Sequence, residues 1–253
     1  MIDDTGAVSV LDRMTAILEA FDESDHGLRI SELATRADLP KSTVSRLVST
    51  LVRERYLERE GQVIHLGLRL FELGQLAHEP RELRGIALPV IADLRDATGG
   101  TVSLAIPDGH EMVCIAVMHG STSAGLTRIG GRLPAHATAL GKTMLAFSDD
   151  VDVEELLASA LPLRTPHTDV DPASLRCQLT DIRQHGVATE VGEFVADVSS
   201  VASPVFAPSG SLLVSICVSG PSDSFDLDRS SAAVHAAALA LTRRIATTRM
   251  TPA

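Results

Sequence analysis

Residues 30–51, ISELATRADLPKSTVSRLVSTL, constrain the fold more than any other part of the chain. Apolar side chains recur at helical spacing on both sides of a short interruption, which predicts two amphipathic helices. The interruption is Asp38-Leu39-Pro40, where Pro40 lacks an N–H group and disfavours helical backbone at Leu39. The sequence therefore predicts two short helices joined by a tight turn.

The outer face of the second helix is unusual for a solvent-exposed surface, because it lacks paired Glu and Lys side chains. It carries hydroxyl and cationic groups instead: Lys41, Ser42, Thr43, Ser45, Arg46 and Ser49, with Arg53 one turn later. Such groups reach phosphate oxygens and base edges. The pattern predicts a helix-turn-helix whose second helix enters the major groove of DNA. An ordinary helical hairpin is the alternative.

The flanking segments complete a small domain. Residues 53–66 contain two short extended runs about Gly61-Gln62, which predict the hairpin of a wing. Upstream, apolar residues at helical spacing predict a helix that closes the core: Val10, Leu11, Met14, Ile17, Leu18 and Phe21. We therefore expect a winged helix-turn-helix over residues 1–66.

These strings resemble the IclR family of bacterial transcription regulators. The resemblance covers SVLDRMTAILEAF, ISELA, LPKSTVSRLVSTLVRERYLER and HLGLRLFELGQLA in the first third of the chain. It continues in PAHATALGKTMLA at 134–146, GVATEVGEF at 186–194 and SSVASPVFAPSGSLLVSICVSGP at 199–221. The resemblance implies an α+β chain, with a GAF-like or profilin-like effector-binding domain after the winged helix.

The charge distribution is compatible with DNA binding despite a net charge of −11 over 253 residues. Between residues 29 and 59 the sequence has seven Arg and Lys residues and four Asp and Glu residues, so this segment carries a net charge of +3. Phosphate contacts are local, and a basic reading head on an acidic body can make them. No run of eighteen apolar residues occurs and Met1-Ile2-Asp3-Asp4 is acidic, so we expect a cytoplasmic protein without a membrane partner.

The remainder divides into a linker and a second domain. Leu68, Phe71, Leu73 and Leu76 predict an amphipathic helix from about 67 to 78, which His78-Glu79-Pro80 is expected to break. A second helix should run to Thr98 and end at Gly99-Gly100. We take 67–80 as a linker helix and 81–253 as an effector-binding and oligomerisation domain. A bare linker is the alternative, whereas the resemblance implies that this helix sets the orientation of the domains.

The pattern within 81–253 predicts an antiparallel sheet packed by helices. Expected strands are 101–106, 112–118, an extended stretch at 125–133, and a hairpin of 198–206 with 212–218. Asp171 and Pro172 are typical of a helix start, and Gly186 of its end. A last helix should fill 227–246.

The segment 134–146 predicts an anion site. Thr138 is a good N-cap, and the first turn should leave the N–H groups of Ala139, Leu140 and Gly141 without intrahelical partners. Exposed N–H groups and the helix dipole both favour a negatively charged ligand. The alternative is an ordinary core contact lined by small residues.

The resemblance to the family extends this site. It implies that the backbone of Ala139 and Leu140 meets a carboxylate, and that Glu190, Ser200, Cys217 and Ser219 line the rest of the pocket. The chain departs from the usual pattern where Glu190-Val191-Gly192-Glu193 replaces an Asp-x-Glu-Glu-like run, and where Cys217 replaces a hydroxyl. The implied partners are operator DNA, a small effector such as an organic acid, and further copies of the chain in a homodimer or homotetramer.

Enzymatic readings have little support in the sequence. Cys114, Cys177 and Cys217 are far apart and are expected to be reduced thiols. The histidines include no HxH or HxxxH pair, so we expect neither metal nor cofactor. No nucleophile, base and oxyanion set can be assembled with His136. The stronger rival is a DNA-binding protein whose second domain serves only for protein interaction and oligomerisation.

Overall fold

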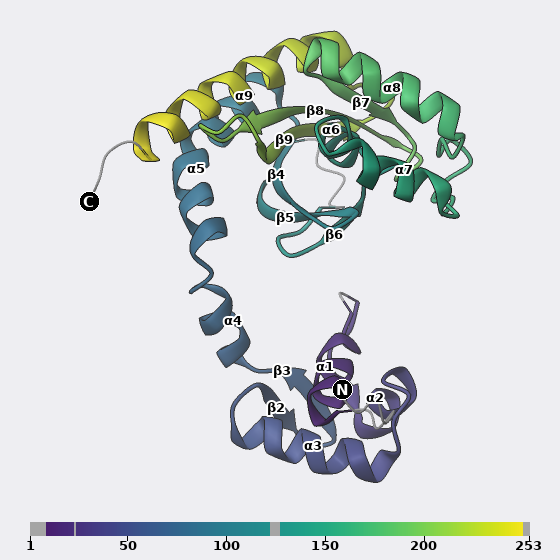
Figure 1. Cartoon of the computed structure of the whole chain (residues 1–253). Coiled ribbons are helices and arrows are strands. Elements are labelled where there is room, and N and C mark those ends of the chain that lie inside the picture. Colours follow the sequence, from purple (N-terminus) through teal and green to yellow (C-terminus); the bar gives the residue numbers. More distant parts are fainter. Residues whose placement is uncertain (1–8, 23, 122–126, 250–253) are drawn as a thin grey trace, which may run out of the picture. The chain divides into compact units, whose positions relative to one another are not determined.

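The computed structural model describes residues 9–22, 24–121 and 127–249 (Figure 1). Its contacts divide the chain into two compact units, Met1–His78 and Glu79–Ala253. Part of the predicted extended stretch at 125–133 lies outside the described residues. No described helix is long and apolar enough to cross a bilayer.

The first unit is three helices and a small sheet, followed by a fourth helix. Its elements are α1 (Val10–Glu19), β1 (Leu28–Arg29), α2 (Ile30–Arg36), α3 (Lys41–Arg53), β2 (Leu57–Glu60), β3 (Val63–Leu66) and α4 (Leu68–Gly74). The antiparallel strands are ordered β1-β3-β2. The β2–β3 hairpin turns at Gly61, which has a positive φ of 59°. A wing therefore follows the second helix of the pair, as predicted.

The turn between α2 and α3 forms at the predicted residues. Asp38 takes a left-handed φ of 49°, and the Leu39 amide donates to the Ala34 carbonyl at 3.0 Å. Pro40 is the N-cap of α3. Apolar residues of α3 then pack inward, with Val44, Leu47, Val48 and Leu51 all buried.

The first helix forms over Val10–Glu19, but two of its predicted core residues are exposed and Phe21 lies beyond its end. Ile17 is fully buried, and Met14, Leu18 and Phe21 pack against the core. Val10 and Leu11 instead expose 57% and 72% of their surface. The helical period places them beyond the contact with α2 and α3, so they do not join the core of this unit.

The predicted linker also differs in detail. Helix α4 ends at Gly74, and α5 (His78–Thr98) begins at the residues that were expected to break a helix. Pro80 lies in the first turn of α5, where a missing N–H group breaks no intrahelical hydrogen bond. The interruption therefore falls at residues 75–77.

The second unit is built on a six-stranded antiparallel sheet ordered β6-β5-β4-β9-β8-β7. Its strands are β4 (Thr101–Asp108), β5 (Glu111–Met118), β6 (Arg132–Pro134), β7 (Ala188–Val191), β8 (Val198–Phe206) and β9 (Leu212–Pro221). Its further helices are α6 (Ala139–Ala146), α7 (Asp150–Ala158), α8 (Pro172–His185) and α9 (Leu227–Arg249). Helices α5 and α9 share one apolar cluster with the sheet, while α6, α7 and α8 share another. The sheet therefore lies between two helical layers.

Local signals in this unit predict its elements well. The Asp171 carboxylate accepts from the amides of Ala173 and Ser174, so it caps α8 with Pro172 in the first turn. Gly186 ends that helix with a φ of 71°. Helix α7 and the short strand β7 were not predicted. Both are short, and β7 has a single partner strand, β8, among the described residues.

Gly141 provides a test of the packing of α6. A Cβ atom built on Gly141 would lie 2.3 Å from the Ala135 Cα. We expect Gly141→Ala to lower the free energy of unfolding by about 1–3 kcal/mol, the usual effect of overpacking. Urea denaturation of the full chain measures the change.

The matched control is Gly85→Ala on α5, where no described atom outside the adjacent helix backbone lies within 4 Å of the added Cβ. Higher helix propensity should make this variant as stable as the parent, or more stable by up to about 1 kcal/mol. If Gly141→Ala behaves in the same way as Gly85→Ala, then α6 does not pack closely against Ala135.

Candidate functional site

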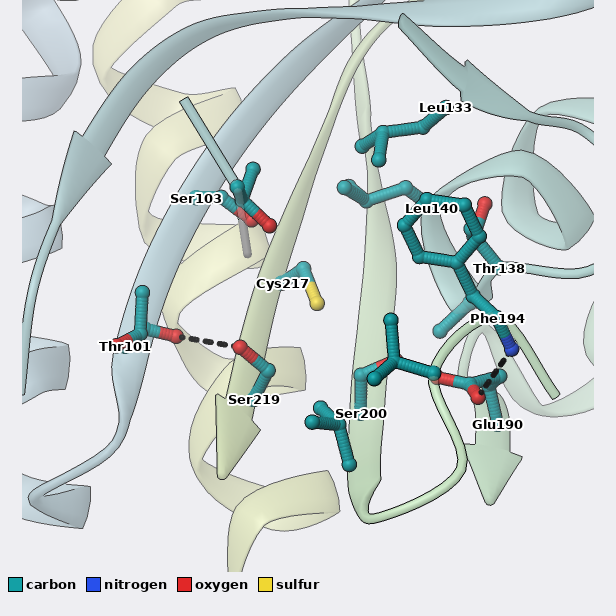
Figure 2. Close-up of a pocket in the computed structure, with 14 residues that line it drawn as sticks. Thr101, Ser103, Leu133, Thr138, Leu140, Glu190, Phe194, Ser200, Cys217 and Ser219 are labelled. Carbon is teal, nitrogen blue, oxygen red and sulfur yellow. Dashed lines mark hydrogen bonds between the residues drawn. The ribbon is translucent and has the colours of Figure 1, made fainter. Parts of the chain in front are cut away.

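A pocket lies between the sheet and α6 in the second unit (Figure 2). It holds about 550 Å³ of empty space, including its opening to solvent. Its lining residues are Thr101, Ser103, Thr127, Leu133, Thr138, Ala139, Leu140, Glu190, Phe194, Val195, Val198, Ser200, Cys217 and Ser219. All six residues predicted for the effector site are among them.

The floor of the pocket is a row of polar side chains across four neighbouring strands. Ser219 of β9 is paired with Thr101 of β4 on one side and with Ser200 of β8 on the other, and Ser200 is paired with Glu190 of β7. Side chains at paired positions project to the same face of a sheet. Segments more than a hundred residues apart therefore present their polar groups to one cavity, as Figure 2 shows.

Glu190 is buried, with 3% of its surface exposed, and both of its oxygens accept hydrogen bonds. Oε1 accepts from the amides of Glu193 and Phe194 at 2.6 and 3.1 Å, and Oε2 accepts from the Ser200 hydroxyl at 2.8 Å. Burial raises the pKa of this carboxyl above its usual range, although the three hydrogen bonds oppose that shift. Glu190 is therefore fixed in place and carries a proton more readily than an exposed glutamate.

Cys217 lies in the second row of the floor, paired with Ser103 and Ala202. Burial, and the nearby Glu190 carboxyl, raise the pKa of its thiol to about 12. Burial raises the pKa of Cys114 to about 11. Both groups are neutral thiols at physiological pH, which makes them poor nucleophiles.

The opposite wall begins at the N-terminus of α6. The Thr138 hydroxyl accepts from the Gly141 amide at 3.0 Å, so Thr138 is the N-cap of α6, as predicted, and the cap already occupies the Gly141 amide. The Ala139 and Leu140 amides have no acceptor assigned within the described residues. Both residues line the pocket and are buried. Two N–H groups at a helix start therefore remain for a ligand.

Several lining residues were missed by sequence reasoning. Thr101 and Ser103 follow the alternation of β4, but their facing residues could be identified only from the register with β9. Phe194 and Val195 belong to the loop after β7, and no periodicity marks them. These two side chains, with Leu133, Ala139, Leu140 and Val198, supply the apolar part of the wall.

The predicted DNA-reading residues lie on α3 of the first unit. Lys41, Ser42, Ser45, Arg46, Ser49 and Arg53 are exposed, and Thr43 is half-buried. The Ser49 hydroxyl donates to the Ser45 carbonyl at 2.8 Å, and the Arg53 guanidinium contacts the Glu54 carboxylate at 3.1 Å. That ion pair is exposed and holds Arg53 only weakly. The arrangement leaves a polar and cationic helix face open to a partner.

The described residues provide no catalytic or metal-binding alternative. No group of three or more His, Cys, Asp or Glu side chains in that part of the chain is placed to hold a metal ion. His136 is buried, and its Nε2 lies 3.0 Å from the Pro162 carbonyl oxygen. This histidine is therefore engaged with the backbone.

Both halves of the chain match known sequence families. The C-terminal domain of the bacterial transcriptional regulator IclR matches residues 75–247, and the IclR helix-turn-helix domain matches residues 10–61. The HTH-type transcriptional repressor AllR of Escherichia coli K12 is 30% identical over 223 residues, which cover 87% of this chain and 82% of AllR. The transcriptional repressor IclR of the same strain is 30% identical over 231 residues, or 89% and 84% of the two chains.

Solved structures agree with this assignment. An IclR homologue from Microbacterium hydrocarbonoxydans, complexed with 4-hydroxybenzoate, has a TM-score of 0.88 at 27% identity and covers 94% of this chain and 100% of that one. The IclR of Thermotoga maritima has a TM-score of 0.74 at 26% identity, covering 93% and 98%. AllR and IclR are transcriptional repressors and not enzymes. The chain belongs to the IclR family of bacterial transcriptional regulators, with an N-terminal helix-turn-helix domain and a GAF-like C-terminal domain.

Proposed function

We propose that this chain is a repressor that binds a pseudo-palindromic operator as a dimer or tetramer and responds to a small carboxylate-bearing metabolite. The observation that carries the proposal is the pocket that brings Ala139, Leu140 and Glu190 together with three residues of the sheet: Ser200, Cys217 and Ser219. The exposed face of α3 supplies the DNA contacts.

The N-terminus of α6 is the preferred position for the effector carboxylate. The Ala139 and Leu140 amides, which have no acceptor within the described residues, lie at the start of a helix whose dipole favours negative charge there. A carboxylate hydrogen-bonded to N–H groups gains more than a neutral acceptor does. Leu133 and Phe194 would pack against the apolar body of the effector.

Glu190 limits what the other end of the effector can be. Its oxygens already accept three hydrogen bonds, and it lies in a buried environment where a second carboxylate would be repelled. A hydroxyl or amine can donate to the remaining lone pairs of Glu190 and Ser200. The pocket therefore favours a monocarboxylate with a hydrogen-bond donor. The 4-hydroxybenzoate of the Microbacterium structure has that composition.

Oligomerisation through the first unit is supported by its exposed apolar surface. The side chains concerned lie on α1, at the end of β3, on α4 and in the turn after it: Val10, Leu11, Leu66, Leu68, Phe71, Leu73 and Leu76, each at least 43% exposed. Exposed apolar surface of this kind is typical of an interaction site, and a second copy of the chain could remove it from water. A dimer also places two reading helices on two half-sites, since a single winged helix makes few base contacts.

Effector binding would act on DNA binding by a population shift. A ligand changes operator affinity only if it has different affinities for two states of the protein. The rival function, a second unit that serves for oligomerisation alone, requires no such coupling. The two are separated by measuring whether an acid that occupies the pocket changes operator affinity.

Three related acids test the proposed effector class. We expect 4-hydroxybenzoate to bind more tightly than benzoate, because it adds a donor, and benzene-1,4-dicarboxylate to bind weakest. Calorimetric titration of the full chain gives the affinities, and operator binding in the presence of each acid gives the coupling. The proposal fails if a wider set of hydroxylated monocarboxylates neither binds nor alters operator affinity.

The reading helix is tested by Arg46→Ala and Lys41→Ala. Both side chains are exposed on α3, so the fold should be unaffected. Loss of a bidentate base contact should weaken operator binding by about 1–3 kcal/mol, and loss of a phosphate contact should chiefly reduce the salt dependence. Gel-shift titration at several salt concentrations measures both effects.

Arg176→Ala on α8 is the control, because it removes the same charge from an exposed ion pair with Glu154 in the second unit. It should leave operator affinity and its salt slope unchanged. If all three variants weaken operator binding equally, net charge governs binding; if Arg46→Ala and Lys41→Ala bind as the parent does, the assigned helix is wrong.

The anion site is tested by Ala139→Leu. The larger side chain fills the space beside the unpaired amides without adding charge, so effector response should be abolished while operator binding is kept. Ser219→Ala, on the floor, should weaken effector binding by only ~0.5–1.5 kcal/mol, the net value of one hydrogen bond. Calorimetry with the acid that responds best measures both.

Ala158→Leu makes the same change in size on the exposed end of α7 and should bind the effector as the parent does. Parental affinity in Ala139→Leu would place the carboxylate elsewhere in the pocket.

A further inference from the structure

Lys142 of α6 is fully buried, with 0% of its side chain exposed. A buried ammonium group is strongly disfavoured unless a counter-charge and hydrogen-bond acceptors replace its water. Within the described part of the chain, its ion-pair partner is Glu193, whose Oε1 lies 2.5 Å from the Lys142 Nζ. Glu193 is itself only 13% exposed at its side chain. The pair therefore joins α6 to the loop that follows β7.

Glu193 also contacts the pocket through its backbone. Its amide donates to Glu190 Oε1 at 2.6 Å, and the next amide, that of Phe194, donates to the same oxygen at 3.1 Å. The Phe194 side chain lines the cavity. One residue thus connects the buried lysine to the pocket carboxylate and to the apolar wall.

The other side of this loop is held by hydroxyl groups. The Thr165 hydroxyl donates to the Gly192 carbonyl at 2.6 Å, and the Thr168 hydroxyl donates to the Glu193 carbonyl at 2.7 Å. Gly192 has a positive φ of 68°, and a Cβ there would lie 2.7 Å from the Ala196 carbonyl oxygen. The loop backbone is therefore fixed on one side by threonines, and the Glu193 side chain is fixed by Lys142 of α6.

We propose that Lys142 is a positioning residue of the effector pocket: through Glu193 it holds residues 192–195 so that the Glu190 carboxylate and the Phe194 ring face the ligand. This inference rests on the proposed function, since it assigns a role in effector binding to a residue that does not line the cavity. Buried ion pairs are often replaceable by apolar pairs without loss of stability. A role in positioning the loop therefore explains the Lys142–Glu193 ion pair better than a role in stabilising the fold.

The test variant is Lys142→Met, with Leu145→Ala as the matched control. Leu145 lies on the same helix, is 2% exposed, and does not line the pocket, so its truncation destabilises α6 but leaves the Lys142–Glu193 ion pair in place. Lys142→Met/Glu193→Leu removes both charges and carries the test if the single variant fails to fold. Thermal unfolding of each variant gives the stability change.

Hydrogen exchange of the effector-free protein measures directly how well the loop amides are protected. In Lys142→Met we expect the Glu193 and Phe194 amides to exchange at least tenfold faster, with the β8 and β9 amides unchanged. Leu145→Ala should not show this local change. The double variant should regain the melting temperature of the parent but keep the fast loop exchange. Parental exchange at both amides in the folded variants would overturn the positioning role.

The affinity for 4-hydroxybenzoate then shows how the loosened loop affects ligand binding. If the wall is in place about a tenth of the time in Lys142→Met, the apparent affinity falls about tenfold, because only that fraction of molecules is competent. Affinity that falls equally in Leu145→Ala would assign the loss to stability and overturn the proposal. Since exchange is measured without ligand, a parent protein that binds no acid contradicts the proposed function and leaves the exchange result to decide the role of Lys142 in the loop.

Discussion

The pocket depends on the antiparallel register of β9 between β4 and β8. That register places Ser219 beside Thr101 and Ser200, and brings Glu190 into the same row through β7. A shift by one residue would turn these side chains to the other face, where Val218, Ile216 and Val214 pack under α5 and α9. The apolar face therefore fixes the register, and the register assembles the polar face. Apolar packing on one face of the sheet thus determines which polar side chains line the pocket on the other face.

Local chemistry made much of the fold predictable. Pro40 starts α3, Asp171 caps α8 and Gly186 ends it, and each acts on neighbours within a few residues. The pocket residues Ala139 and Ser219 were found because they lie in motifs that resemble a known family. Their physical partners were not predictable, because pairing across strands depends on contacts between distant segments.

The predictions that failed also concern contacts between distant segments. Val10 and Leu11 continue an apolar helical pattern, yet they lie beyond the core of their own unit and remain exposed. The burial of Lys142 could not be inferred from a sequence in which lysine usually marks a surface. Its counter-charge, Glu193, is fifty-one residues away. Periodicity identifies a face of a helix, but only the whole fold determines what covers it.

Chain continuity offers the proposed regulator a route between the effector and the DNA-binding unit. Thr101, at one end of the polar row, follows Thr98, the last residue of α5, after only Gly99 and Gly100. Gly99 takes a φ of 72°, and a Cβ on Gly100 would lie 2.9 Å from the Ser219 carbonyl oxygen, so these glycines join the helix to the floor tightly. Helix α5 then runs back without interruption to His78, where the first unit ends. An effector that prefers one position of Thr101 and Ser219 therefore also prefers one position of the α5 C-terminus. In the proposed function, that preference would supply the differential affinity for two states on which a regulatory response depends.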